Sequence, residues 1–302
     1  MSNTERFERV ARLVDPQAKL VRTWELKGGV SAEMTALELV GSDGRTRKLV
    51  VRRHEREARQ GSSPRVADEV RLLRLLRSRG LAVPVPRFVD QTGTILPAPY
   101  GVFDYVEGEP EFSPAAMGEL LQQMSAQLAA IHAVSGLDPD LSFLPDQTGL
   151  RDDDIRQRPP VLDELICEGR VRDVLERVWP PSSSNGDALL HGDFWPGNIL
   201  WRDARIVAVI DWEDAARGDP LSDLAIARLE ILWAFGVEAM HAFTEQYRSV
   251  TSIDLTRLPV WDLCAALRPA GKIDEWASDE VAATAMRRDH RAFVEQALAA
   301  LG

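Results

Sequence analysis

The spacing of hydrophobic and polar residues changes along the chain and divides it into two parts. The first part contains the strand-like stretches VRTWEL, SAEMTALELV and RKLVVRR, separated by a Gly-Gly turn and by the turn GSDGR. An Asp-Gly pair between two strand-like stretches indicates a β-hairpin. Residues 1–20 have the pattern of a short amphipathic helix. We therefore expect a sheet with one helix at the N-terminal end.

The next stretch adds one helix and two extended segments to this sheet. Residues 66–79 carry leucines at helical spacing, and Gly80 is a typical helix stop. LAVPVPRFVD is expected to be extended, because each proline disfavours helical backbone at the residue before it. PYGVFDYVEG resembles a further short strand, and EGEPE then resembles a connector.

Beyond residue 114 the helical spacing predominates. AAMGELLQQMSAQLAAIHAV predicts a helix that ends by Gly136, and a second helix is expected at 161–179. Residues 137–160 are acidic and are expected to be irregular. Four more helical stretches are expected before the C-terminus.

One hairpin interrupts the helical part. NILW and RIVAVID flank the short turn RDA, which predicts a tight β-hairpin. The chain is thus predicted to be α+β, with a small strand-rich part at 1–106 and a larger, mainly helical part at 107–302. Repeated βαβ units are not indicated.

Composition limits the class of protein. The chain has 302 residues, 45% of them apolar and 27% charged, which is normal for a soluble globular protein. No apolar run is long enough for a membrane span, and the charged N-terminus lacks the apolar core of a secretory signal. Cys167 and Cys264 are far apart, so we expect two buried thiols in a reducing cytoplasm.

The charge is negative overall and unevenly distributed. A net charge of −11 argues against general nucleic-acid binding. Residues 1–106 hold 19 Lys and Arg against 13 Asp and Glu, a balance of +6. Residues 107–302 hold 17 against 34, a balance of −17. Either this asymmetry only keeps the protein soluble, or the two parts bind differently charged molecules.

The chemistry is concentrated around the predicted hairpin. Asp193 and Asn198 lie in the loop HGDFWPGN just before it, and Asp211 ends the stretch RIVAVID. A hairpin places its start and end side by side, so Asn198 and Asp211 are expected to converge. Amide and carboxylate oxygens suit Mg²⁺, which phosphates often help to bind. Asp193 could then accept or orient the proton of a hydroxyl group. The alternative is an ordinary turn between core segments.

Two motifs carry a resemblance to a known family. HGDFWPGN is similar to the H-x-D-x-x-x-x-N catalytic loop of protein-kinase-like enzymes, in the H-G-D form of aminoglycoside phosphotransferases and choline kinases. IDWEDAARGDPLSDLA resembles the metal-binding segment of that family. The resemblance runs from about residue 20 to about residue 235.

This resemblance implies a bilobal, protein-kinase-like fold. Residues 1–106 would form the nucleotide-binding lobe, and residues 107–302 the catalytic and acceptor-binding lobe. It implies a Mg²⁺-dependent phosphotransferase that uses ATP or GTP and a small-molecule alcohol. Asp193 would be the catalytic residue, and Asn198 and Asp211 the metal ligands.

The resemblance also suggests residues for nucleotide binding. LKGGVSAEMTALEL resembles the phosphate-covering loop, although it lacks G-x-G-x-x-G, and a plain hairpin turn is the alternative. Its phosphate-binding residues would be Gly28, Gly29 and Ser31. In FDYVEGE, which resembles the hinge between lobes, Phe103 would lie near the adenine and Val106 would offer backbone hydrogen bonds.

One departure concerns the phosphate-binding lysine of the family. In the strand KLVVRRH the aligned residue is Arg52, which keeps the positive charge but is longer and planar. The resemblance implies that Arg52 pairs with Glu69 in the leucine-rich helix. Lys48, on the same strand, is the alternative cation. Because of this departure, both ATP and GTP stay open as donors.

Other polar residues are expected to support the structure. Asp223 resembles the residue that anchors the backbone of the catalytic loop, and the role of His191 in this loop is usually structural. Asp219 before a proline is typical of a helix start, and His132 is expected to be a hydrogen-bonded core residue. Trp195 in the loop is a candidate contact for the acceptor.

The functional alternatives differ in class. A small-molecule kinase needs the acidic residues that are present. A catalytically weak nucleotide-binding or regulatory protein is suggested by Arg52 and the atypical glycine loop. A metal-dependent phosphoesterase would need further Asp and His ligands that the sequence lacks. A cationic acceptor, such as an aminoglycoside, would suit the acids Glu213, Asp214 and 152–154.

Overall fold

The computed structural model describes residues 2–26, 33–53, 65–182 and 185–302, so the proposed phosphate-loop residues Gly28, Gly29 and Ser31 lie outside the described residues. The chain divides into two compact units. Residues 1–108 and 207–210 form one of them, and residues 109–206 and 211–302 form the other. The two units are described separately below.

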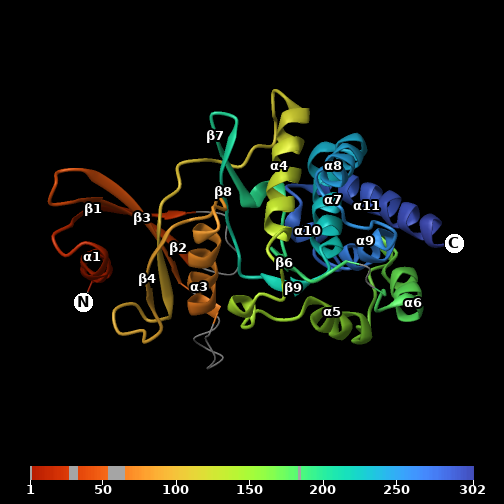
Figure 1. Cartoon of the computed structure of the whole chain (residues 1–302), viewed down its shortest axis with the longest axis horizontal. Coiled ribbons are helices and arrows are strands. Elements are labelled where there is room, and N and C mark those ends of the chain that lie inside the picture. Colours follow the sequence, from red (N-terminus) through yellow and green to blue (C-terminus); the bar gives the residue numbers. More distant parts are fainter. Residues whose placement is uncertain (1, 27–32, 54–64, 183–184) are drawn as a thin grey trace. The chain divides into compact units, whose positions relative to one another are not determined.

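The N-terminal unit is built on a five-stranded antiparallel sheet (Figure 1). The order of its strands is β1-β2-β3-β5-β4. The strands are β1 (Lys19–Leu26), β2 (Glu33–Val40), β3 (Thr46–Arg53), β4 (Pro86–Asp90) and β5 (Tyr100–Asp104). The three strand-like stretches and the two extended segments expected from the sequence are thus confirmed.

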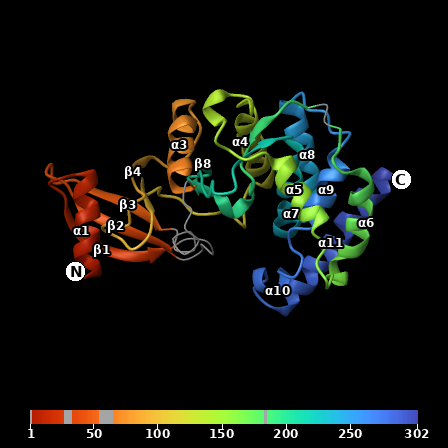
Figure 2. The same ribbon diagram turned by 90° about the horizontal axis from the view of Figure 1, so that it is seen from below.

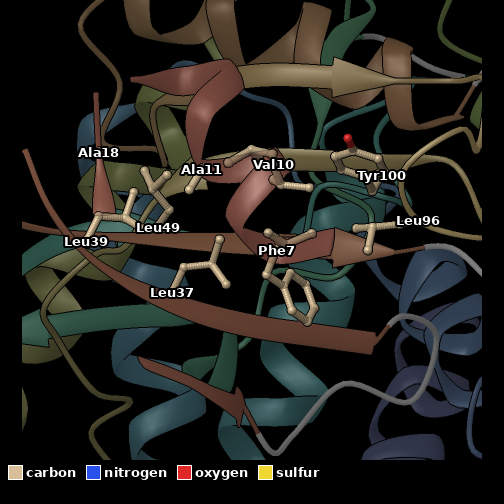
Figure 3. Packing of buried hydrophobic residues seen from close by; sticks show 11 residues of the cluster. Phe7, Val10, Ala11, Ala18, Leu37, Leu39, Leu49, Leu96 and Tyr100 are labelled. Carbon is tan, nitrogen blue, oxygen red and sulfur yellow. The ribbon is translucent and has the colours of Figure 1, made fainter. Parts of the chain in front are cut away.

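Helix α1 (Asn3–Val14) covers one face of this sheet. The side chain of Ser2 caps it and exchanges hydrogen bonds with Glu5, which satisfies backbone N–H groups at the helix start. Figure 3 shows Phe7 and Val10 of α1 among leucines of β2 and β3. Burial of these side chains holds α1 on the sheet.

Helix α3 (Arg65–Ser78) packs against β4 and β5 (Figure 2). Its leucine-rich side is buried, as its spacing predicted. On β3, Leu49 and Val51 belong to the core beneath α1. Successive residues of a strand alternate between faces, so Arg52 projects from the opposite face of the sheet.

The second unit is mainly helical. Its central helix α7 (Leu221–Phe235) packs against α8 (Val237–Val250) and α9 (Leu258–Ala266), and α11 (Glu280–Leu301) packs against α7 and α9. Helix α4 (Met117–His132) packs against α8 (Figure 1). Eleven residues of α7 are buried on all sides of the helix, which is typical of a helix inside a core.

Shorter elements complete this unit. They are η1 (Pro139–Leu141), α5 (Gln147–Arg156), η2 (Glu164–Ile166), α6 (Glu168–Val178), β6 (Ala188–Leu190), η3 (Pro196–Asn198), β7 (Ile199–Arg202), β9 (Ala216–Gly218) and α10 (Ile273–Trp276). Strand β8 (Arg205–Val209) begins in this unit, and its residues 207–209 belong to the N-terminal unit. Strands β7 and β8 pair, as do β6 and β9. Asp203 and Ala204 between β7 and β8 have φ angles of 51° and 56°. Two positive φ values suit a tight two-residue hairpin, so this prediction is confirmed.

Some sequence predictions need correction. Residues 147–156 form α5 although their apolar pattern is weak, because Ile155 is buried and hydrogen bonds join the segment to Ser222 and Arg172. The helix expected at 161–179 is α6 and begins only at Glu168. Cys167 is half-buried rather than buried, because it occupies the turn between η2 and α6 with φ of 60°. Both cysteines are free thiols.

The α+β class is confirmed, with strands concentrated in the N-terminal unit and helices in the other. In the parts of the chain that the structure covers, we find no helix of the length and apolarity needed to cross a bilayer.

Candidate active site

Asp193 lies in the loop between β6 and β7, and its carboxylate is held from two sides. The Asn198 side-chain amide donates to its Oδ2 at 3.0 Å and to its backbone oxygen at 2.9 Å. Arg268 donates to its Oδ1 at 2.5 Å. The two contacts fix the direction of the carboxylate. About a quarter of the Asp193 side chain stays exposed, so a substrate can still reach it.

Asp223, in the first turn of α7, anchors the backbone of this loop. Its carboxylate accepts hydrogen bonds from the backbone N–H of His191 at 2.6 Å and of Gly192 at 2.9 Å. The Nε2 atom of His132 lies 3.2 Å away, and the other ring nitrogen of His132 bonds the hydroxyl of Tyr247. The anchoring role of Asp223 and the core role of His132 are thus as expected.

The pKa of Asp223 follows from these contacts. Complete burial by itself would raise the pKa, but the hydrogen bonds from His132 and from the backbone of His191 lower it below its usual range. Asp223 is therefore an ionised anchor at neutral pH.

Gly192 allows the loop to approach the segment after β8. Its φ is 82°, and a Cβ atom there would lie 2.1 Å from the backbone oxygen of Asp214. No other residue fits this position without displacing backbone. The neighbouring His191 ring is fully buried beside Trp212, and its Nδ1 accepts from the Asp193 backbone N–H. His191 is thus structural.

The two candidate metal ligands lie at the two ends of the hairpin. Asn198 ends η3 just before β7, and Asp211 is the second residue after β8, with φ of 65°. The amide nitrogen of Asn198 is directed to Asp193, and its side-chain oxygen takes no part in these two bonds. Asp211 adopts a left-handed conformation that aspartate tolerates better than most residues.

Negative charge gathers around these positions. Although Asp214 reaches solvent, removal of water from its carboxyl raises the pKa, and the charges of Asp193 and Asp211 raise it further. In the described part of the chain, no three His, Cys, Asp or Glu side chains form a metal cage. One amide and one carboxylate fit Mg²⁺, which takes few protein ligands and completes its shell with phosphates and water.

In the N-terminal unit, Arg52 and Glu69 form the predicted pair. Arg52 Nη1 lies 2.8 Å from Glu69 Oε1, and both residues are more than 90% buried. Lys48, the alternative cation, instead lies 2.7 Å from Glu107 and over the ring of Tyr105. The geometry thus favours Arg52 as the counterpart of the family lysine.

The two predicted adenine-side residues belong to β5 and the segment after it. Phe103 is buried and stands opposite Val50 of β3. Val106 is half-buried, and it lies beyond the last paired residue of β5, Asp104. Its backbone is therefore outside the sheet ladder, as hinge binding would require.

Sequence reasoning missed two residues near Asp193. Arg268 lies just beyond the end of α9, and Glu230 lies in α7. Neither belongs to a motif, and 75 residues separate Arg268 from Asp193. Trp195, a candidate acceptor contact, packs its ring on Gly197 and lies 6.2 Å from the ring of Phe112.

A cavity of about 810 Å³ adjoins the loop within the second unit, and Gly192, Asp214 and Arg268 contribute to its wall. Its charged lining contains as many acids as bases. These residues are Asp154, Asp163, Glu168, Asp214, Arg151, Arg172, Arg268 and Lys272.

Comparison with known proteins identifies the family. Residues 25–267 match the model of the phosphotransferase enzyme family (APH). The chain belongs to this family. Acyl-CoA dehydrogenase family member 11 from Rattus norvegicus is 28% identical over 189 residues, which are 56% of this chain and 23% of that protein. The matched part of the chain thus spans about a quarter of the length of the acyl-CoA dehydrogenase family member 11 proteins.

Solved structures share the whole fold. A macrolide 2′-phosphotransferase of type I is 19% identical, with a TM-score of 0.65 over 95% of this chain and 97% of the other. The amicoumacin kinase hAmiN, solved with AMP-PNP, Ca²⁺ and Ami, is 15% identical, with a TM-score of 0.65 over 98% and 94%. These similarities confirm the protein-kinase-like fold.

Proposed function

We propose that this protein is a Mg²⁺-dependent kinase that transfers the γ-phosphate of ATP or GTP to a hydroxyl group of a small molecule. The observation that carries the proposal is the fixed carboxylate of Asp193, held by Asn198 in a loop that the buried Asp223 anchors. Phosphoryl transfer depends mostly on positioning and on neutralising charge, and this loop is built for positioning.

Three residues of the second unit have proposed roles in the reaction. Asp193 accepts the proton of the acceptor hydroxyl or orients that hydroxyl toward the phosphate. Asn198 and Asp211 supply oxygen ligands for Mg²⁺. The bound metal would neutralise charge on the phosphates of the nucleotide.

Residues of the N-terminal unit are proposed to bind the nucleotide. Arg52, kept in place by Glu69, would bond the phosphates through its planar guanidinium. Phe103 and Val106 would contact the adenine or guanine base. The glycine loop, with Gly28, Gly29 and Ser31, is proposed to cover the phosphates on the strength of the resemblance alone.

Replacing Arg52 by alanine is expected to lower kcat/KM for the nucleotide by about 10- to 100-fold. A factor of this size corresponds to the loss of hydrogen bonds to a charged group. Steady-state kinetics at varied nucleotide concentration measure this effect. Arg52→Lys should recover part of the activity, because the positive charge returns.

Arg53→Ala is the matched control for this experiment. Arg53 belongs to the same strand but pairs with Glu33 and, by alternation, projects from the other face of the sheet. The assignment is wrong if Arg53→Ala is the more damaging substitution. Thermal unfolding of both variants separates lost phosphate binding from lost stability, since Arg52→Ala leaves Glu69 buried without its partner.

The acceptor is proposed to bind in the cavity beside the loop. Three of the four acids of the lining have protein partners: Asp154 pairs with Arg151, Glu168 pairs with Arg172, and Asp163 accepts backbone hydrogen bonds. Because four bases line the cavity beside the four acids, the local lining carries no excess of negative charge. The cationic acceptor inferred from the overall charge of residues 107–302 stays a prediction, and the names of the structural relatives support only a small-molecule acceptor.

The cell compartment proposed for this reaction is the cytoplasm, where nucleoside triphosphates and Mg²⁺ are plentiful. Two free cysteines, one of them buried, support a reducing environment. The proposed partners are thus a nucleoside triphosphate and a hydroxyl compound.

A turnover screen tests the proposed function. The full chain is incubated with Mg²⁺ and ATP or GTP, together with amine-bearing, neutral and acidic hydroxyl compounds at low and high salt. We expect a phosphorylated alcohol with at least one compound, and none when Mg²⁺ is chelated. For a cationic acceptor, kcat/KM should fall as salt rises.

The outcomes of this screen separate the alternatives. Nucleotide binding without phosphoryl transfer to any compound would favour the regulatory alternative. A best acceptor that is neutral or anionic would disprove the cationic hypothesis and leave the kinase standing.

A further inference from the structure

Arg268 is a cation placed between two acids inside the second unit. Its Nη2 lies 2.5 Å from Asp193 Oδ1, and its Nη1 lies 3.9 Å from Glu230 Oε1. The three side chains come from the loop after β6, from the end of α9 and from the middle of α7. Each is between 17% and 25% exposed, so solvent screens the contacts only in part.

Helix α7 supports the loop at two points. Asp223 and Glu230 are seven residues apart, which is nearly two full turns, so they lie on the same face of α7. Asp223 bonds the loop backbone directly, whereas Glu230 faces Arg268, which in turn bonds the Asp193 side chain. One buried helix thus determines both where the loop runs and where its carboxylate points.

The electrostatics favour Asp193 as the main partner of Arg268. Burial raises the pKa of Glu230 to about 7, so Glu230 is only partly ionised near neutral pH. The Arg268 guanidinium is therefore directed mainly to Asp193, at the shorter of the two distances. Arg268 also faces Asp214: burial, and after it the charges of Asp193 and Asp211, raise the pKa of Asp214, and the charge of Arg268 lowers it.

We propose that Arg268 is a positioning residue for phosphoryl transfer, which holds the Asp193 carboxylate toward the acceptor, while Glu230 gives Arg268 a second, weaker contact from α7. This inference rests on the proposed function. Arg268 takes one oxygen of Asp193 and Asn198 takes the other. A carboxylate has about four acceptor sites, so these two bonds orient it and leave sites for a substrate hydroxyl.

The contact between Arg268 and Asp193 lies at the edge of the cavity described above. Arg268 lines the cavity beside Gly192 and Asp214. Asp193 is not itself part of the cavity wall, so an acceptor bound there would lie beside the guanidinium that contacts Asp193. A shift of a catalytic group by about 1 Å can lower a rate by roughly 10²-fold, so we expect loss of this contact to lower kcat.

The test compares Arg268→Met and Arg268→Lys with a matched control. Arg268→Met should lower kcat by about 10- to 100-fold with the nucleotide KM changed less than twofold, because Asp193 loses its orientation while the nucleotide site is intact. Arg268→Lys should recover part of kcat. The acceptor is the best compound of the screen, and water is the acceptor in a parallel measurement of phosphate release from Mg·ATP.

Arg228→Met is the control, because it removes a buried arginine that joins the same two helices. Arg228 of α7 bonds Asp262 of α9 at 3.1 Å through two nitrogens. This variant should lower the melting temperature but leave kcat close to that of the wild type. If Arg228→Met lowers kcat as much as Arg268→Met at the same loss of stability, the role of Arg268 is only structural.

A double-mutant cycle tests whether Arg268 acts through Asp193. In an Asp193→Asn background, Arg268→Met should lower kcat by less than twofold, because the carboxylate that it orients is gone. A further drop as large as in the wild-type background would overturn the proposal.

Hydrogen exchange gives a readout without turnover. Arg268→Met should speed the exchange of amides in the peptide that covers residues 190–198, whereas Arg228→Met should not. Unchanged exchange in this peptide, with unchanged kcat, would overturn the positioning role. If the wild-type protein transfers phosphate to no acceptor, the proposed function fails, and the exchange result alone decides whether Arg268 fixes the loop.

Discussion

Replacing Asp193 by asparagine is expected to lower kcat by roughly 10²–10⁴-fold, the usual contribution of a positioned acid or base. The amide has nearly the shape of the carboxylate but cannot accept a proton at neutral pH. Asn198 and Asp223 stay in place, so nucleotide binding should be retained. Steady-state kinetics with the best acceptor, together with calorimetric titration of the nucleotide, measure the two effects separately.

Asp203→Asn provides the same chemical change at a position without a proposed role. Asp203 is exposed in the hairpin turn with φ of 51°, a conformation that asparagine also accepts. This variant should be as active as the wild type. Near-normal turnover of Asp193→Asn would exclude Asp193 as the catalytic carboxylate, and another acid near the cavity would then have to be sought.

Asp223→Asn is expected to lower the free energy of unfolding by about 3–5 kcal/mol, the range measured when a buried charged group loses its partner. The two backbone N–H groups of His191 and Gly192 would face an amide that also donates, and His132 would lose its anion. Turnover should fall as well, because the loop that carries Asp193 loses its anchor. Chemical denaturation and kinetics measure both effects.

The effect of Asp223→Asn should depend on pH with a definite sign. The pKa of Asp223 is lower in the folded protein than in the unfolded chain, so its carboxylate stabilises the fold above the unfolded value, near 4. This stabilisation is lost as pH falls through the folded pKa. The difference between wild type and variant should therefore be largest near neutral pH and shrink in acid. A difference that is constant with pH would contradict the ionic role.

Asp279→Asn is the control for stability. Asp279 caps the start of α11 by accepting from the N–H of Ala282, and asparagine caps helices about as well as aspartate. We expect the unfolding free energy of this variant to stay within about 0.5 kcal/mol of the wild type.

Most of the secondary structure was predictable from the sequence, because it depends on local spacing. The hairpin between β7 and β8 needs only two short apolar stretches and a turn in which Asp203 and Ala204 take positive φ. Helix α1 needs an apolar stripe and the capping pair Ser2–Glu5. These elements are determined within a dozen residues of sequence.

Helix α5 shows where local reasoning fails. Its sequence QTGLRDDDIR has a weak apolar stripe, and the acids in it suggest an irregular loop. In the folded chain Gln147 is buried and donates to Ser222 of α7, and Arg172 of α6 donates to backbone oxygens of α5. Contacts with distant segments thus stabilise a helix that its own pattern does not predict.

In the candidate site, too, some features are predictable from the sequence and others depend on tertiary packing. Asp193, Asn198 and Asp211 belong to one loop and one hairpin, so their motif and spacing suffice to predict them as a group. The contacts of Arg268 exist only because α7 and α9 pack together, which brings Arg268 within hydrogen-bonding distance of Asp193 and within 3.9 Å of Glu230. The sequence by itself thus determined which groups are proposed for the chemistry. Only the tertiary structure decided what orients them, because such contacts depend on packing across the core and leave no periodic pattern in the chain.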